Sequence, residues 1–269
     1  MSGQKVSANG IDIGFTIDGD RSPTKPWLVF AHSLACDRSM WEPQVQAFSR
    51  SCNLLRYDLR GHGLSSAPPG EYTLETHADD LKGLLDALRI QRCHFVGLSL
   101  GGMIGQMAAL RMPMRFASLT LADTTSRYPA DARVIWDQRI AAVRGATGMN
   151  AVVASTLERW FTADFRVRRP DVVARIGQLI RNTPINGYIG SAQGIAKLNL
   201  TARLESIHCP VLVIVGEEDR GTPPAMAEEI VRAIPGARLE RIPEAAHLSN
   251  VERPFAFNLA LRSFLGGGA

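Results

Sequence analysis

With 269 residues, 45% of them hydrophobic, the chain is long enough to bury a sizeable core as one large α/β domain or as one domain with an insertion. Its net charge of +4 is modest and scattered, which argues against a nucleic-acid-binding protein. It has no stretch of about 18 uninterrupted apolar residues, and the N-terminal MSGQKVSANG lacks the apolar core of a signal peptide, so we expect a cytoplasmic protein without a membrane span.

The first predicted element is a hairpin. Asn9-Gly10 is a strong turn signal, and Ile11, Ile13, Phe15 and Ile17 follow it at period two, which predicts an antiparallel opening strand. Short apolar runs typical of strands buried on both faces follow at residues 27–31, 53–58, 94–98, 118–123, 210–216 and 237–243.

Helical patterns alternate with these runs. Leucines at 81, 84, 85 and 88 follow the i, i+3, i+4, i+7 rule, and a second helix runs from a glycine-rich turn near residue 100 to Pro113. Strands that alternate with helices predict a mostly parallel, twisted sheet with helices on both faces.

The alternation stops between residues 125 and 200. This segment contains no convincing strand and predicts about four helices, at roughly 130–145, 148–162, 169–182 and 186–198. Because the strand pattern resumes afterwards, we expect a core of residues 1–124 and 201–269 with an inserted helical cap, residues 125–200. Helices inserted at the carboxyl edge of a parallel sheet form a lid over the place where such folds bind ligands.

The sequence Gly97-Leu98-Ser99-Leu100-Gly101 fits the G-x-S-x-G pattern of a nucleophile on a sharp strand-to-helix turn. Short glycine-serine strings are common, but this one follows a predicted strand and opens a predicted helix, as the mechanism requires. We therefore predict that Ser99 is a nucleophile and not merely a polar loop residue.

A serine hydroxyl needs a base and an orienting carboxylate, expected downstream in the order Asp or Glu, then His. Asp219 and His247 lie in loops after the last two predicted strands and are our candidates. Asp219 is preferred over Glu217 and Glu218 because two residues separate it from the end of the strand, and Asp123, which follows an earlier strand, is the main alternative. The other five histidines are expected to have surface or structural roles.

The backbone N–H groups of Leu100, after the nucleophile, and Leu34, after the first long buried strand, are predicted to form an oxyanion hole. The four cysteines are widely separated, with no C-x-x-C pair and no histidine at metal-ligand spacing. We therefore expect reduced, mostly buried thiols, no metal and no cofactor.

Several motifs together resemble the α/β-hydrolase superfamily, in the order of that family: HSLACDRSMW, YDLRGHGLS, GLSLGG, GEEDRGTPP and AAHLSN. GLSLGGMIGQ, LERWFTADFR and AHLSNVERP resemble most closely the 3-oxoadipate enol-lactonases of bacterial aromatic catabolism. The resemblance implies an α/β-hydrolase fold and a Ser99–Asp219–His247 triad that opens an enol-lactone. Enol-lactonases commonly have Asn-Ser-Leu-Gly where this chain has His32-Ser33-Leu34-Ala35, which bears on the substrate more than on the reaction class.

Charge is unevenly distributed along the chain. Residues 125–200 hold ten arginines and one lysine against five acidic residues, a local charge of +6, so the rest of the chain carries about −2. Such a cap would attract a small anionic substrate, although the chain uses arginine throughout and most of these side chains are expected to face water. Arg139 and Arg159 are candidate substrate ligands, and Trp136 and Trp160 are candidate pocket walls or core residues.

The expected activity is cofactor-free hydrolysis of a small lactone through an acyl-enzyme. The same triad also serves carboxylesterases, hydrolases of C–C bonds and perhydrolases, because the cap and pocket choose the chemistry in this fold. A small-molecule receptor with incidental hydrolysis is the alternative from another class. The sequence is compatible with a homo-oligomer and does not determine the oligomeric state.

Overall fold

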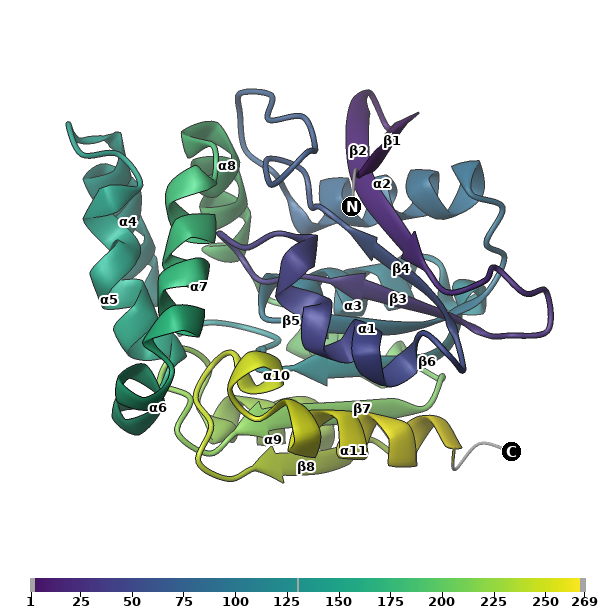
Figure 1. Ribbon diagram of the computed structural model, residues 1–269. Helices are drawn as coiled ribbons and strands as arrows, with labels where there is room; N and C mark the ends of the chain where they lie inside the picture. The colour runs from purple at the N-terminus through teal and green to yellow at the C-terminus, as the bar shows by residue number, and fades with distance from the viewer. Residues whose placement is uncertain (1–2, 130, 267–269) are drawn as a thin grey trace.

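Eight strands form one sheet in the computed structural model, which describes residues 3–129 and 131–266 (Figure 1). They lie side by side in the order β1-β2-β4-β3-β5-β6-β7-β8, with β3 to β8 parallel and the first two strands antiparallel to their neighbours. Their bounds are β1 Gln4–Ala8, β2 Ile11–Asp18, β3 Trp27–Ala31, β4 Asn53–Tyr57, β5 Cys93–Leu98, β6 Phe116–Ala122, β7 Val211–Gly216 and β8 Arg238–Ile242. The predicted sheet class is confirmed.

The predicted hairpin joins β1 to β2. Asn9 and Gly10 have φ angles of 47° and 75°, the left-handed conformation that a tight two-residue turn requires and that asparagine and glycine tolerate best. The antiparallel opening predicted from the period-two pattern is therefore present, and β2 continues into the sheet by pairing with β4.

The central strands are buried on both faces, as their continuous apolar runs predicted. The last strand differs from that expectation. In β8, Arg238, Glu240 and Arg241 are exposed, because no strand pairs with its outer side among the described residues. The run at 237–243 is thus an edge strand, and we correct its predicted burial.

Helices cover both faces of the sheet (Figure 1). On one face, α2 packs on α3, α3 contacts β5 and β6, and α9 packs on β7. On the other face, α1 and α11 lie together. Their bounds are α1 Glu42–Phe48, α2 Leu74–Ala87, α3 Leu100–Arg111, α9 Pro224–Ala233, α10 Ser249–Glu252 and α11 Pro254–Gly266. In the part of the chain that the structure describes, no helix is long and apolar enough to cross a membrane.

The segment 125–200 forms a group of helices at one end of the sheet (Figure 1). It contains α4 Ala132–Arg144, α5 Asn150–Trp160, α6 Ala163–Arg168, α7 Pro170–Asn182 and α8 Ile185–Ile195. Four of these match the predicted helices, and α6 is an additional short one. The two ends of the segment lie side by side, since Arg127 forms a β-bridge with Asn199. The division of the chain into core and cap stays a prediction.

All four cysteines are free thiols. Cys36, Cys52 and Cys93 are buried and Cys209 is partly exposed, so the expectation that the thiols are mostly buried is confirmed. Burial raises the pKa of each thiol, which keeps it protonated at neutral pH.

Candidate active site

Ser99 lies on a strained turn between β5 and α3. Its φ and ψ angles are 55° and −113°, a conformation that a residue with a side chain rarely adopts. A Cβ at Gly97 would lie 2.2 Å from the carbonyl oxygen of Gly101, and one at Gly101 would lie 2.1 Å from that of Ala31. Only glycine fits at both places, so the flanking glycines of the motif allow the sharp turn that holds the Ser99 side chain at the carboxyl end of the sheet.

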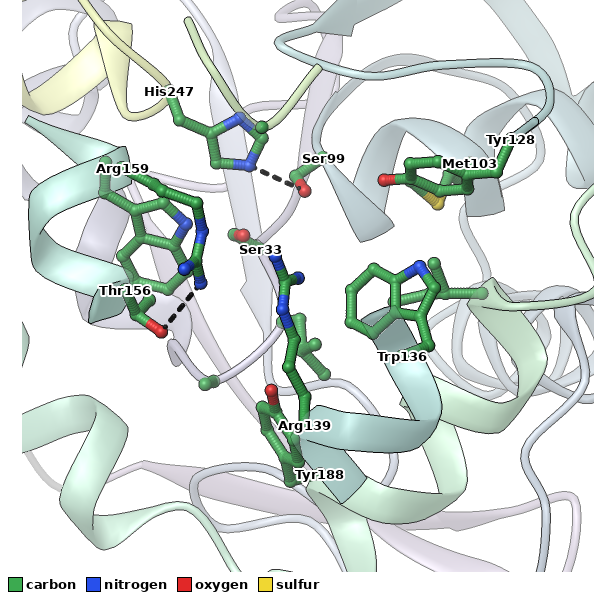
Figure 2. Close-up of a pocket in the computed structure, with 15 residues that line it drawn as sticks. Ser33, Ser99, Met103, Tyr128, Trp136, Arg139, Thr156, Arg159, Tyr188 and His247 are labelled. Carbon is green, nitrogen blue, oxygen red and sulfur yellow. Dashed lines mark hydrogen bonds between the residues drawn. The ribbon is translucent and has the colours of Figure 1, made fainter. Parts of the chain in front are cut away.

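The structure brings together the three residues predicted to form the triad. His247 Nε2 lies 2.9 Å from Ser99 Oγ (Figure 2), and His247 Nδ1 lies 2.8 Å from Asp219 Oδ2. All three residues are buried, with Ser99 8% exposed. The arrangement is that of a hydroxyl donating to a neutral imidazole, whose other nitrogen donates to a carboxylate.

Asp219 is oriented by its own loop. Its Oδ1 accepts the backbone N–H groups of Gly221 at 2.7 Å and Thr222 at 3.0 Å, and its Oδ2 accepts the Thr222 hydroxyl at 2.8 Å. These donors hold the carboxylate in place, so that Oδ2 faces His247.

His247 is more basic than an ordinary histidine. Burial alone lowers its pKa, but the charge of Asp219 and the hydrogen bond to it outweigh burial, and the net pKa is raised above 6.5. The Trp160 indole lies nearly parallel to the imidazole, with ring centroids 6.2 Å apart, and shields one face of it from water.

Asp123, the alternative acid, is not hydrogen-bonded to His247 in the described structure. Its Oδ1 accepts the Gly216 N–H at 2.8 Å and its Oδ2 accepts the Ser249 hydroxyl at 2.5 Å. Burial, and then the nearby charge of Asp219, raises the pKa of Asp123 to about 8. The geometry therefore favours Asp219 as the partner of the imidazole, and Asp123 joins the strand before Asp219 to the loop after His247.

The N–H groups predicted for an oxyanion hole are free to donate to a ligand. Neither Leu34 N–H nor Leu100 N–H donates a hydrogen bond to any residue that the structure describes. Leu34 lies in a turn closed by the Cys36 N–H, which donates to the Ser33 carbonyl at 3.2 Å, and Ala35 in that turn has a φ of 59°. Leu34 lines the pocket beside Ser99, whereas the buried Leu100 side chain does not.

Two histidines hold the Leu34 turn from behind. His32 Nδ1 donates to the Ser33 carbonyl at 2.7 Å while its Nε2 accepts the Leu59 N–H at 3.0 Å, and His62 Nε2 accepts the Ala35 N–H at 3.1 Å. Burial lowers the pKa of His32 to about 4 and that of His62 to about 3, so both stay neutral. These are structural roles, as expected for histidines other than His247.

A pocket opens over Ser99 between the sheet and the helices of segment 125–200. All four cap candidates line it: Trp136 and Arg139 from α4, and Arg159 and Trp160 from α5. Figure 2 shows Arg159 and Trp136 on opposite sides of the space next to Ser99, with Arg139 reaching between them. Asp219 lies behind His247 and does not reach the pocket.

The two arginines carry positive charge without a carboxylate partner among residues 3–129 and 131–266. The Arg139 guanidinium lies over the Trp136 ring at 4.7 Å, and Arg159 Nη2 donates to the Thr156 hydroxyl at 3.2 Å. Burial, and then the like charge of Arg139, lowers the pKa of Arg159. Uncompensated guanidinium groups beside a nucleophile form a subsite suited to an anion.

A family model described as the alpha/beta hydrolase fold matches residues 26–254. The chain belongs to the α/β-hydrolase family. Ser99 and His247 both fall within the matched residues, as do the helices of segment 125–200.

Three relatives of this α/β hydrolase are informative. It is 34% identical to 3-oxoadipate enol-lactonase 2 of Acinetobacter baylyi, over 90% of this chain and 89% of that protein. The crystal structure of the enol-lactonase from Burkholderia xenovorans LB400 is 39% identical, with a TM-score of 0.94 over 98% of this chain and 100% of that one. A candidate carbamate hydrolase, RutD of Pseudomonas syringae pv. syringae, is 28% identical over 89% of this chain and 93% of that protein.

Sequence reasoning missed several pocket residues of this α/β hydrolase. Besides the predicted residues, five labelled in Figure 2 line the pocket: Ser33, Met103, Tyr128, Thr156 and Tyr188. They come from separate elements of the chain, and no local pattern distinguishes them from core residues. The available signals were for Ser33, which lies in the motif that contains Leu34, and for Met103, which lies in the motif that contains Ser99.

Proposed function

We propose that this α/β hydrolase opens a small lactone that carries a carboxylate, with 3-oxoadipate enol-lactone as the best candidate substrate. The observation that carries the proposal is the pair of arginines, Arg139 and Arg159, without carboxylate partners among the described residues, in the same pocket as Ser99. The names of the enol-lactonase relatives support the same substrate class.

In the proposed mechanism, Ser99 Oγ attacks the lactone carbonyl while His247 Nε2 accepts the hydroxyl proton. Asp219 keeps the proton on His247 Nδ1 and stabilises the imidazolium that forms. The N–H groups of Leu34 and Leu100 donate to the oxyanion of the tetrahedral intermediate.

The ring C–O bond then breaks, and the ring oxygen leaves as an enolate, which takes up the proton held by the His247 imidazolium and so returns the imidazole to its neutral form. An enolate is a much better leaving group than an amine, so little general-acid help is required. Water next attacks the acyl-enzyme with His247 as base, and release of the carboxylate restores Ser99. The net reaction consumes one lactone and one water and yields the open-chain oxo acid.

Within this proposal, residues 125–200 act as a cap over a core of residues 1–124 and 201–269. α4 and α5 supply Arg139 and Arg159 to the carboxylate arm of the substrate, and Trp136 and Trp160 supply apolar walls. The cap thus selects an anionic substrate, while the core supplies the hydrolytic chemistry.

The arginine pair predicts a charge-dependent loss of activity. Arg139→Gln and Arg159→Gln are each expected to lower kcat/KM for the enol-lactone by about 10- to 100-fold, because each removes a charge-assisted hydrogen bond to the substrate. A neutral ester of similar size is expected to change by less than about threefold. Steady-state kinetics on both substrates measure the difference.

The matched control is Arg133→Gln. Arg133 lies in α4, the helix that holds Arg139, and its side chain is 72% exposed. This substitution is expected to leave the kinetics on both substrates unaffected. Equal efficiency of the unsubstituted protein on the enol-lactone and the neutral ester would contradict selection of an anion.

A carbamate is the second candidate substrate, because the RutD relative bears that name. The same serine, histidine and oxyanion donors are suited to attack on a carbamate carbonyl. A panel of enol-lactone, carbamate and aryl ester separates the candidates, since the largest kcat/KM identifies the substrate class. Turnover well below one per second on every member would favour a receptor.

The raised pKa of His247 predicts the acid limb of the pH profile. Only the neutral imidazole accepts the Ser99 proton, so kcat/KM falls as pH drops through the pKa of His247 and reaches its plateau above it. Because the charge of Asp219 raises that pKa, we expect the midpoint above pH 6.5. A pH series with a neutral aryl ester, which does not titrate itself, measures it, and a midpoint below 6.5 contradicts the assignment.

A further inference from the structure

Glu252, at the end of α10, is a buried acid that the proposed chemistry does not use. Its side chain is only 4% exposed, and no lysine or arginine bonds to it in the described ranges. Instead Oε1 accepts the N–H of Thr162 at 3.0 Å and the hydroxyl of Thr162 at 2.5 Å, while Oε2 accepts the N–H of Ala246 at 2.9 Å. Both carboxylate oxygens are therefore occupied, one by donors 90 positions away in the chain and the other by a donor six positions away.

These donors join the catalytic loop to segment 125–200. Ala246 directly precedes His247, and Thr162 caps the N-terminus of α6, where its hydroxyl accepts the Phe165 N–H at 3.2 Å. On the other side of His247, the Leu248 N–H donates to the Trp160 carbonyl at 3.2 Å. The histidine loop is thus tied to the junction between α5 and α6 both before and after His247.

The same junction forms part of the pocket wall. Trp160 stacks along the His247 imidazole, with ring planes 25° apart, and its neighbour Arg159 lines the pocket. A shift of the junction relative to the loop would therefore change the position of the imidazole and the shape of the pocket together.

A carboxylate suits this place better than any neutral side chain. It offers acceptors on both oxygens, whereas a carboxamide offers one acceptor and turns an NH2 donor toward another donor. Burial is the largest influence on Glu252 and raises its pKa, while the donors from Thr162 and Ala246 partly offset burial by stabilising the ionised form.

We propose that Glu252 is a positioning residue, which fixes the α5–α6 junction to the loop of His247 and so keeps the imidazole and the pocket wall aligned during turnover. The role rests on the proposed hydrolysis through Ser99 and His247.

The test compares Glu252→Gln and Thr162→Val with Glu244→Gln, a control on the same loop whose side chain is 75% exposed. The readouts are kcat and KM for p-nitrophenyl acetate, the thermal midpoint, and the NMR resonance and titration of the His247 imidazole. Glu252→Gln is expected to lower kcat by about 10- to 100-fold and to shift the imidazole resonance and its titration midpoint, because the Ala246 donor loses its acceptor.

Thr162→Val removes a link on the side of the pocket wall and is expected to raise KM more than it lowers kcat. Thr162→Ser keeps the hydroxyl and is expected to restore both constants, and Glu244→Gln is expected to match the unsubstituted protein. Thr162→Val also tests the proposal if Glu252→Gln does not fold.

A Glu252→Gln protein with a lower thermal midpoint but unchanged kcat and an unchanged imidazole titration would overturn the proposal, since Glu252 would then be structural only. An unchanged KM in Thr162→Val would overturn the part of the proposal that concerns the pocket wall. If the unsubstituted protein opens no lactone, the proposed substrate fails. The imidazole resonance still decides the role of Glu252, because that measurement requires no substrate.

Discussion

Ser99→Ala is expected to lower kcat for lactone opening by a factor on the order of 10⁶ while the protein remains folded. The hydroxyl is the proposed nucleophile, so its removal leaves only binding and the oxyanion donors. The fold is expected to persist because alanine occupies the strained φ of 55° with no more difficulty than serine. Steady-state kinetics and the thermal midpoint measure the two effects.

The control for this substitution is Ser118→Ala, another buried serine, whose hydroxyl lies 2.7 Å from His94 Nδ1, away from the pocket. It is expected to keep kcat close to that of the unsubstituted protein. Mass spectrometry of the protein during turnover adds a direct test, because an acyl adduct is expected on Ser99 and absent from Ser99→Ala. A Ser99→Ala protein with more than a few per cent of the original kcat would refute the mechanism.

Asp219→Asn is expected to lower kcat by about 10⁴-fold, whereas Asp123→Asn is expected to lower it by less than about tenfold. The Asp219 carboxylate keeps the proton on His247 Nδ1, and an amide in its place no longer stabilises the imidazolium. Asp123 bonds to Gly216 and Ser249 instead. Its raised pKa favours the neutral form, which an amide resembles.

The comparison between these two variants decides which carboxylate orients His247 and stabilises its imidazolium. Both replace a buried carboxyl by an amide of the same shape, and the thermal midpoint of each variant shows whether a loss of kcat comes from unfolding. The Asp219→Asn protein is also expected to have its acid limb shifted to lower pH, because the charge that raises the pKa of His247 is gone. The opposite order of kcat losses would give the role to Asp123.

The meeting of Ser99, Asp219 and His247 could be predicted from order alone. Each follows a predicted parallel strand, and the carboxyl ends of parallel strands lie at one edge of a sheet, whatever the distance along the chain. The choice between Asp219 and Asp123 was less secure, because both follow such strands. Their hydrogen bonds distinguish them in the structure. Asp219 bonds to His247 Nδ1, whereas Asp123 bonds to the Ser249 hydroxyl.

Short or exposed elements were predicted less well. The helix α6 has only six residues, fewer than two turns, so its apolar periodicity is too short to separate it from a loop. Its start could be inferred only from Thr162, which caps it. The strand β8 lies within the expected range. Its position at the edge of the sheet depends on which strands pair with each other, and no local sequence pattern encodes that pairing.

By itself the sequence determined the α/β class, most of the helices of residues 125–200 and the order of the candidate catalytic residues, because local periodicity and turn chemistry carry that information. Only the tertiary structure decided that Arg139 and Arg159 line one pocket with Ser99, and that Glu252 bonds to Thr162, 90 positions away. The physical reason is that side-chain contacts between distant elements follow from how those elements pack. A charged residue in a helix has the same local pattern whether it faces water, a pocket or a buried partner.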